Sequence, residues 1–297
     1  MQNLETTPEI SIKNILYPTD FSLAAESALP FVIDIAGMFG SRVTAVYVRT
    51  PDAVVLMPPL SFPYETEPPS DSIREFADSL EPKLAGVEHE CLIGEGEVWD
   101  FVEQVIKERE IDLVVVGTQG RTGLEKFMLG SAAELIFRQA DCPVLTIGPY
   151  VTNGVHNKWE MKNILWATDF TPASLASAAL AFSIASERHA RLTLLHVLER
   201  PAAEDLVDPQ RYIDSTVRML QHQVPKGLGD DCHLSYEVSQ GIPSDEILKA
   251  ARERGSDLIV LGVRPAPGRL GLATHLARPT AHRVVCKAGC PVLTVRG

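Results

Sequence analysis

Short apolar runs alternate with longer amphipathic segments along the whole chain, and this alternation predicts strands and helices in turn. In the first half the predicted strands are residues 12–17, 42–48, 88–93, 112–116 and 143–147. The predicted helices are a segment ending near residue 39 and residues 70–84, 98–109 and 131–139. The proline-rich segment 51–69 predicts an irregular surface loop that could cover a site as a flap. Strands alternating with helices indicate a parallel sheet with right-handed crossovers.

The same order of segments occurs twice. Three segments of the first half recur in the second: 13–22 (KNILYPTDFS) as 162–171 (KNILWATDFT), 112–117 as 257–262, and 142–146 as 290–294 (both CPVLT). Asp169 follows its counterpart Asp20 by 149 residues. We therefore predict two tandem α/β domains, residues 1–150 and 151–297, joined by a polar linker over roughly 149–160.

The stretch after the fourth predicted strand carries the most informative chemistry. Residues 117–131 have the sequence GTQGRTGLEKFMLGS, with four glycines in the first fourteen positions. Glycine lets backbone N–H groups approach a ligand closely. Ser131 and Glu134 have the spacing of a capping box at the start of the next helix, and Arg121 and Lys126 add positive charge. Together these features predict a site for an anion, with phosphate as the first choice.

The spacing of the glycines separates this loop from two common phosphate-binding patterns. It contains neither the Walker run Gly-x4-Gly-Lys-Ser/Thr nor the dinucleotide pattern Gly-x-Gly-x-x-Gly. Its spacing, Gly-x2-Gly-x9-Gly-Ser, resembles the nucleotide-binding motif of the universal stress protein family. The Thr-Asp-Phe-Ser/Thr strand ends and the Cys-Pro-Val-Leu-Thr segments are also typical of that family, so the resemblance covers essentially the whole chain.

The resemblance implies a fold and a ligand. The fold would be two tandem Rossmann-like domains, each a five-stranded parallel sheet in the order 3-2-1-4-5 flanked by helices, with the ligand where the strand order reverses. The ligand would be an adenine nucleotide, ATP, with or without Mg. The implied contacts are Pro18, Thr19, Asp20 and Val48 on the side of the base and ribose, and Gly117, Gly120, Gly130 and Ser131 on the side of the ribose and phosphates. Arg121 is added to this set because of its positive charge and not because of the resemblance. Asp20 could equally be a helix N-cap.

The second half departs from this motif. Gly262 is followed by a segment rich in arginine and proline, and Arg278-Pro279 stands in place of the Gly-Ser pair. Pro279 has no N–H to donate, and Pro265 occupies a position where a glycine is expected. We therefore expect the second domain to be a structural partner that binds no nucleotide, or to bind another ligand through its arginines.

The composition of the chain limits the classes of molecule that the protein is expected to bind. With 27 basic and 39 acidic residues the formal charge is −12, which argues against binding to nucleic acids or anionic membranes. No apolar run has the length of a membrane span, and the first residues lack the pattern of a secretory signal. Five scattered cysteines favour reduced thiols and a cytoplasmic protein. His282, Cys286 and Cys290 lack a fourth ligand, so we predict no metal site.

Three functions follow from these features, none with a predicted catalytic residue. The first is a regulatory or stress-survival factor that binds ATP in domain 1 and is not an enzyme, weak ATPase activity aside. The second is a slow nucleotide hydrolase or a transferase, with Asp20, Glu125 and Glu134 near the loop as possible bases or metal ligands. The third is a nucleotide-free interaction scaffold. In each, the two domains could pair within the chain through strands 144–147 and 292–295, as family members do in homodimers, and a homodimer of the whole chain is a further option.

Overall fold

The computed structural model describes residues 11–49, 78–118, 129–152, 154, 158–199, 208–228, 232–264 and 280–297. The first half contains β1 (Asn14–Pro18), α1 (Leu23–Phe39), β2 (Arg42–Arg49), β3 (His89–Glu95), α3 (Val98–Glu108), β4 (Leu113–Gly117), α4 (Ser131–Gln139) and β5 (Val144–Ile147). The second half contains β6 (Asn163–Ala167), α5 (Pro172–Ala176), α6 (Ala178–Glu187), β7 (Arg191–Leu198), α7 (Pro209–Gln223), β8 (His233–Gln240), α9 (Pro243–Arg254), β9 (Leu258–Val263), α10 (Thr280–Lys287) and β10 (Val292–Arg296). The predicted loop 51–69 and most of the predicted helix 70–84 lie outside the described residues.

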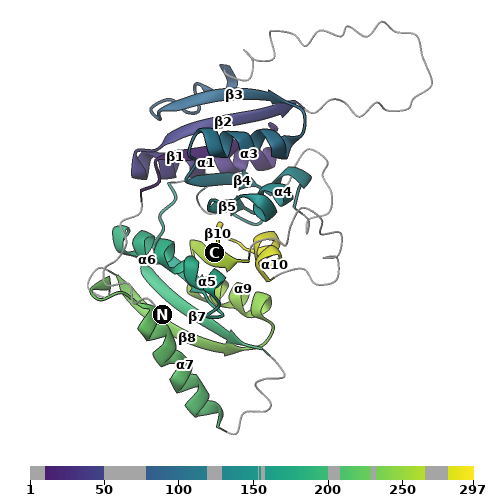
Figure 1. Cartoon of the computed structure of the whole chain (residues 1–297). Coiled ribbons are helices and arrows are strands. Elements are labelled where there is room, and N and C mark those ends of the chain that lie inside the picture. The colour runs from purple at the N-terminus through teal and green to yellow at the C-terminus, as the bar shows by residue number, and fades with distance from the viewer. Residues whose placement is uncertain are drawn as a thin grey trace, which may run out of the picture.

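The strands of both halves form one sheet. Their order is β3-β2-β1-β4-β5-β10-β9-β6-β7-β8, so each half contributes five strands in the order 3-2-1-4-5. Neighbours within a half are parallel, whereas β5 and β10 pair antiparallel where the halves meet (Figure 1). Across this seam Thr146 Oγ1 donates to the carbonyl of Val292, and Thr294 Oγ1 donates to that of Val144. The expected pairing of the last strands is therefore present within the chain, and it merges two sheets into one of ten strands.

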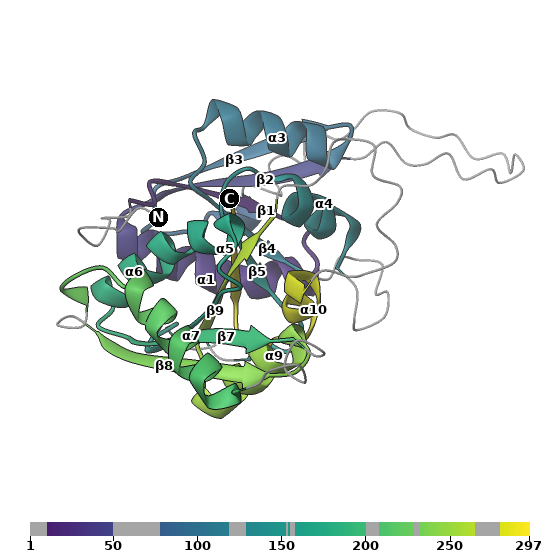
Figure 2. The same ribbon diagram turned by 60° about the horizontal axis from the view of Figure 1, so that its bottom comes forward.

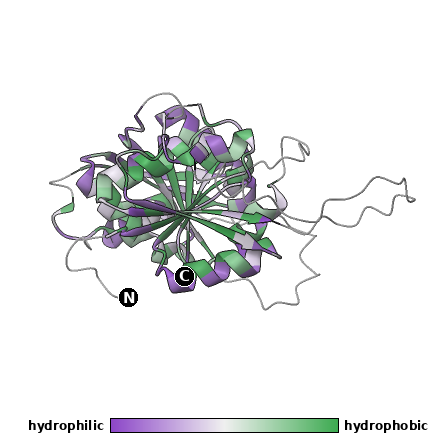
Figure 3. Cartoon of the chain, turned by 90° about the horizontal axis from the view of Figure 1, so that it is seen from above, coloured by the Kyte–Doolittle hydropathy of each residue, from purple (hydrophilic) through white to green (hydrophobic). Residues whose placement is uncertain are grey.

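Helices cover both faces of the sheet, and each face has its own apolar core. One core runs from α1 to α6 and α7, and the other joins α3 and α4 to α9 and α10. Neighbouring residues of β1 illustrate the division, since Ile15 and Leu16 are both fully buried but belong to different cores. Seen from above, the twisted strands fan out and are mainly hydrophobic, with helices of mixed character around them (Figure 3). No helix in the described segments is long and apolar enough to cross a membrane.

The segment between the halves is anchored by a buried tryptophan. Trp159 is only 2% exposed, and its ring lies edge-on to Phe31 of α1 with 5.1 Å between the centroids. Its amide donates to Asp34 Oδ2 at 2.6 Å, and its indole Nε1 donates to the carbonyl of Asp257 at 3.1 Å. Trp159 therefore ties the first half to the second, a role that a merely polar linker would not have.

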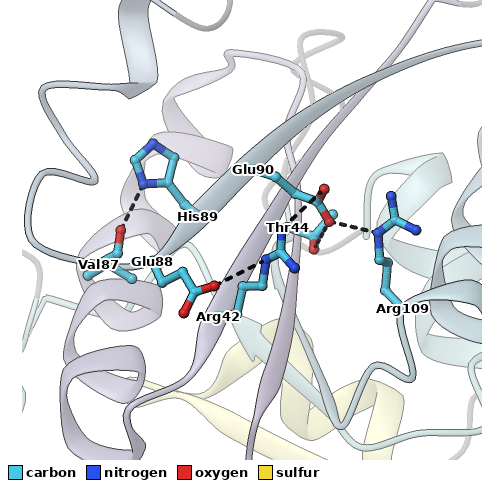
Figure 4. A network of polar contacts seen from close by, with 7 residues as sticks. All are labelled: Arg42, Thr44, Val87, Glu88, His89, Glu90 and Arg109. Atoms are coloured by element: carbon cyan, nitrogen blue, oxygen red, sulfur yellow. Dashed lines mark hydrogen bonds and ion pairs between the residues drawn. The ribbon is translucent and has the colours of Figure 1, made fainter.

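A polar network joins the outer strands β2 and β3 to the end of α3 (Figure 4). The Glu90 carboxylate accepts from Arg109 Nε at 2.7 Å and from Thr44 Oγ1 at 3.1 Å, and it lies 3.6 Å from Arg42 Nη2. Partial burial alone would raise the pKa of Glu90. The hydrogen bonds from Arg109 and Thr44 and the two arginine charges outweigh this effect, so the pKa lies below its ordinary value of 4.5.

Replacing Glu90 by glutamine should lower the free energy of unfolding by about 0.5–1 kcal/mol near pH 7, because ion pairs close to the surface contribute little. The folded pKa is depressed, so the stabilisation is complete above the unfolded pKa and is lost as pH falls through the folded pKa. Urea unfolding near pH 7 and near pH 3 should show the difference between the two proteins shrinking in acid. Glu88→Gln is the control, because the Glu88 side chain is 77% exposed; an equal loss in both variants would contradict the prediction.

Candidate functional site

The turn after β1 is built by side chains that accept backbone hydrogen bonds. Thr19 Oγ1 accepts from the amide of Phe21 at 3.2 Å, and Asp20 Oδ1 accepts from the amide of Ser22 at 2.9 Å. Ser22 in turn is the N-cap of α1, since its hydroxyl accepts from the amide of Ala25. The N-cap is therefore Ser22, and the alternative role of Asp20 as the N-cap is wrong. Asp20 instead holds Ser22, the residue that caps α1, by accepting a hydrogen bond from its amide.

The second half repeats this turn bond for bond. Thr168 Oγ1 accepts from Phe170 N, Asp169 Oδ1 accepts from Thr171 N, and Thr171 caps α5. The phenylalanines of both turns have φ of 60°, a left-handed conformation that a bulky residue adopts only when its surroundings impose it. Burial would raise the pKa of Asp169, but hydrogen bonds from Thr171 and Ser174 hold it below its ordinary value. Both turns are thus structural devices, whatever else Asp20 does.

Gly117 has a steric reason to be glycine. A Cβ at this position would lie 2.1 Å from the carbonyl oxygen of Ala24, at the start of α1. The equivalent Gly262 meets the same obstacle, because a Cβ there would lie 2.0 Å from the carbonyl oxygen of Ala173. Glycine at the end of β4 therefore allows the start of α1 to lie close to the strand, and the second half retains this glycine although the sequence of its loop differs.

The start of α4 differs from the predicted capping box. Gly130 is the N-cap, and it has no side chain with which to cap the helix. Glu134 pairs with Arg138 at 2.7 Å instead of reaching back, and the amide of Gly130 donates to the carbonyl of Thr118 at 2.7 Å, which holds the entry to the helix. The capping box at Ser131 and Glu134 is therefore wrong, and Ser131 is the first residue of the helix.

This arrangement leaves α4 with a suitable polarity for an anion. The amides of its first turn, from Ser131 to Ala133, precede the first intrahelical hydrogen bond, which Glu134 N donates to Gly130 O. They lie at the positive end of the helix dipole. At the other end, the guanidinium of Arg296 on β10 donates to the carbonyls of Phe137 and Arg138. A residue of the second half thus helps to hold the helix whose N-terminus faces the site.

These elements enclose a cavity of 210 Å³ at the carboxyl ends of β1, β2 and β4. The residues predicted from the sequence that line it are Pro18, Thr19, Asp20, Val48, Gly117, Gly130 and Ser131. Gly120 and Arg121 lie outside the described residues, as does Lys126. Seven residues from four segments are therefore brought together as predicted, at the point where the strand order reverses.

Further lining residues were missed by the sequence reasoning. They form an apolar wall of Val46, Val98, Val102, Val116 and Ile136. The signal that could have found Val98 and Val102 is their position in the first turns of the predicted helix 98–109, which follows a strand of the same sheet. The cavity consequently has an apolar side and a polar side, the latter formed by the β1 turn and the start of α4.

Most of the second half's counterpart of this loop lies outside the described residues. Pro265, Arg269, Arg278 and Pro279 lie outside the described residues. Among the residues that the structure describes, no group of three or more His, Cys, Asp or Glu side chains could hold a metal ion. Within the described segments, the cavity lined by seven of the predicted site residues lies in the first half.

Comparison with known proteins agrees with the internal repeat. The model of the universal stress protein family matches residues 11–148 and again residues 160–296. The chain belongs to the universal stress protein family. It is 26% identical to universal stress protein Rv2005c of Mycobacterium tuberculosis over 298 residues, which cover 95% of this chain and 96% of that protein. Two matches to one family model make it a tandem member of the universal stress protein family.

Two further relatives of this universal stress protein differ in length. MJ0531 of Methanocaldococcus jannaschii is 33% identical over 143 residues, 46% of this chain and 81% of the relative. The crystal structure of a universal stress protein from Archaeoglobus fulgidus is only 18% identical but covers 97% of this chain and 99% of its own, with a TM-score of 0.69. The structural likeness shows that the fold of the whole tandem chain is shared.

Proposed function

We propose that this universal stress protein binds an adenine nucleotide, ATP in the first instance, in the cavity of its first half, and that it acts as a regulatory or stress-survival factor rather than as an enzyme. The observation that supports the proposal is the lining of one cavity by seven residues chosen from the sequence. The apolar wall suits a base, and the amides at the start of α4 suit a phosphate. Thr19, Asp20 and Ser22 also line the cavity, and their side-chain oxygens suit a ribose.

The volume of the cavity indicates how much of a nucleotide the described residues could surround. Its 210 Å³ is below the range of about 300–1,000 Å³ usual for ligand pockets. The described residues would therefore surround the base and ribose rather than a whole nucleotide. No Lys or Arg is among the described lining residues, so Arg121 and Lys126 are the proposed source of positive charge for the phosphates, with Mg as an accompanying ion.

Regulation would work by a shift of populations. A nucleotide that contacts the β1 turn, β2 and α4 together favours the conformation in which these elements are held at their present spacing. Arg296 connects α4 to the second half, so a change in α4 would reach the other domain and the surface shown to a partner protein. The second domain is proposed to be the structural partner in this arrangement.

Hydrolysis is the weaker alternative. Asp20 is the one carboxylate among the described lining residues, and its Oδ1 already accepts a hydrogen bond from Ser22. Phosphoryl transfer also requires a positioned water and charge stabilisation. Binding without rapid turnover is therefore the function that the geometry favours.

Gly130→Arg tests the proposal, because a long side chain at the helix N-cap would fill the polar side of the cavity. Nucleotide released from the denatured wild-type protein should be an adenine nucleotide, one per chain. Titration calorimetry with Mg-ATP should show binding that is at least about 100-fold weaker in the variant. Gly37→Arg is the matched control, since Gly37 lies exposed on α1 with nothing within 4 Å of a Cβ, and it should bind as the wild type does.

Three other outcomes have distinct meanings. No released nucleotide and no binding heat would reject ATP binding and favour the scaffold. Equal weakening by Gly37→Arg would show that the loss is not local to the cavity. Metal-dependent phosphate release that disappears in Gly130→Arg would favour the hydrolase.

A further inference from the structure

A second cavity lies between the two halves, on the sheet face that carries α1 and α6. Its volume is 280 Å³. Ile35 and Phe39 of α1 line one side, and Leu180 and Ile184 of α6 line the other. The two helices, one from each half, are labelled in Figure 2. Residues of β4, β5, β9 and β10 form its floor on either side of the seam. It shares no lining residue with the nucleotide cavity and is therefore a separate feature.

The end of the linker and the residue just after it complete the wall. Trp159 and Met161 both line the cavity and are 2% and 3% exposed. The two hydrogen bonds of Trp159, to Asp34 and to the carbonyl of Asp257, fix the ring in place. Since the helices, strands and linker around it belong to one continuous apolar core, the cavity is preformed and does not depend on a ligand to order its walls.

Two of the polar side chains around the cavity, those of Asp112 and Trp159, already have hydrogen-bond partners. Asp112 lines it, but its Oδ2 accepts from the amides of Lys13 and Asn14 at 2.7 and 2.9 Å. The indole N–H of Trp159 is used by the carbonyl of Asp257. Ser11 is the other polar side chain among the described lining residues, and it is exposed. A charged or strongly polar ligand would lose its water here without gaining comparable hydrogen bonds, which costs free energy.

The size of the cavity indicates the size of the ligand. A dry cavity of about 150 Å³ is known to hold benzene, and typical ligand pockets begin near about 300 Å³. With 280 Å³, this cavity falls between the two and suits a molecule of about two fused rings.

We propose that the cavity between α1 and α6 is a binding site for a small uncharged apolar molecule of about two fused rings. Because the walls of the cavity come from both halves, a bound ligand contacts both of them and stabilises their junction. Binding of this ligand is independent of the nucleotide proposed for the first half, and it does not require that proposal to hold.

Naphthalene is the probe for the test, with the full-length protein labelled with ¹³C at its six methionine methyl groups. The Met161 signal, assigned by its absence in Met161→Leu, should shift with saturation as naphthalene is added, and the midpoint of thermal unfolding should rise. Ala179→Phe places a ring in the cavity from α6 and should weaken binding at least about tenfold. Ala85→Phe is the control at an exposed position away from the cavity, where affinity should stay within about twofold.

Several results would overturn the proposal. One is a Met161 signal that does not move up to the solubility limit of naphthalene, and another is equal affinity in Ala179→Phe and the wild type. If Ala179→Phe does not fold, Ala176→Leu serves in its place, because Ala176 lies exposed at the edge of the cavity. Unchanged affinity in that variant would reject the site.

Discussion

Replacing Trp159 by alanine is expected to lower the free energy of unfolding by about 3–5 kcal/mol, the range for removing a buried aromatic side chain. Trp159 is 2% exposed and packs on Phe31, so its loss enlarges the cavity between the halves. The backbone carbonyl of Asp257 also loses its indole donor, and a buried acceptor left without a partner adds to the cost. Equilibrium unfolding in urea, followed by circular dichroism, measures the change.

Two variants separate the parts of this effect. Trp159→Phe keeps most of the packing and loses the indole hydrogen bond, so it should cost about 1–3 kcal/mol. Trp99→Ala is the matched control, because Trp99 is only half-buried beside the other core and should cost less than Trp159→Ala. Equal losses from Trp159→Ala and Trp99→Ala would contradict the view that Trp159 anchors the two halves.

The alternation of elements was predictable because this sheet is buried on both faces. Parallel strands covered by helices appear in the sequence as continuous apolar runs, so the strand predicted at 42–48 is found at Arg42–Arg49 and that at 112–116 at Leu113–Gly117. The tandem repeat followed from matching segments alone. The joining of β5 to β10 was expected from the family resemblance but did not follow from the residues of these strands, since an apolar strand has the same pattern whether its edge is paired or not.

The contacts of individual side chains were less predictable. Trp159 lies in a segment of polar composition, and only the packing of α1 against it reveals its burial. The capping box at Ser131 has the correct residues at the correct spacing, but the hydrogen bond from Gly130 to Thr118 places the cap one residue earlier. Such tertiary contacts override local patterns because they are made by residues far apart in the sequence.

The candidate site could be predicted from the sequence better than the side-chain contacts, but less completely than the order of the elements. Resemblance to a family identified seven residues that do share a cavity, although their positions come from four separate segments. It could not say why each residue is there. Asp20 and Gly117 each have a structural task that recurs at Asp169 and Gly262 in the other half, so their presence alone is weak support for a ligand. Gly130 and Ser131, which the second half replaces by Arg278 and Pro279, are therefore the more informative pair.

Gly117→Val should cost at least about 3 kcal/mol, the upper end for overpacking, because the obstacle is a backbone carbonyl that cannot rotate away. The added Cβ would lie 2.1 Å from Ala24 O, so α1 must move away from β4 and the cavity of the candidate site must open. Gly262→Val should be equally destabilising, with 2.0 Å to Ala173 O, yet folded protein should still bind Mg-ATP. Gly37→Val, with nothing within 4 Å of the added Cβ, controls for the change of residue type.

Urea unfolding of all three variants measures the loss of stability, and calorimetry measures their binding of Mg-ATP. If Gly117→Val is as stable as Gly37→Val, the close approach of α1 is not what requires glycine, and a direct role of Gly117 towards the ligand becomes the better explanation.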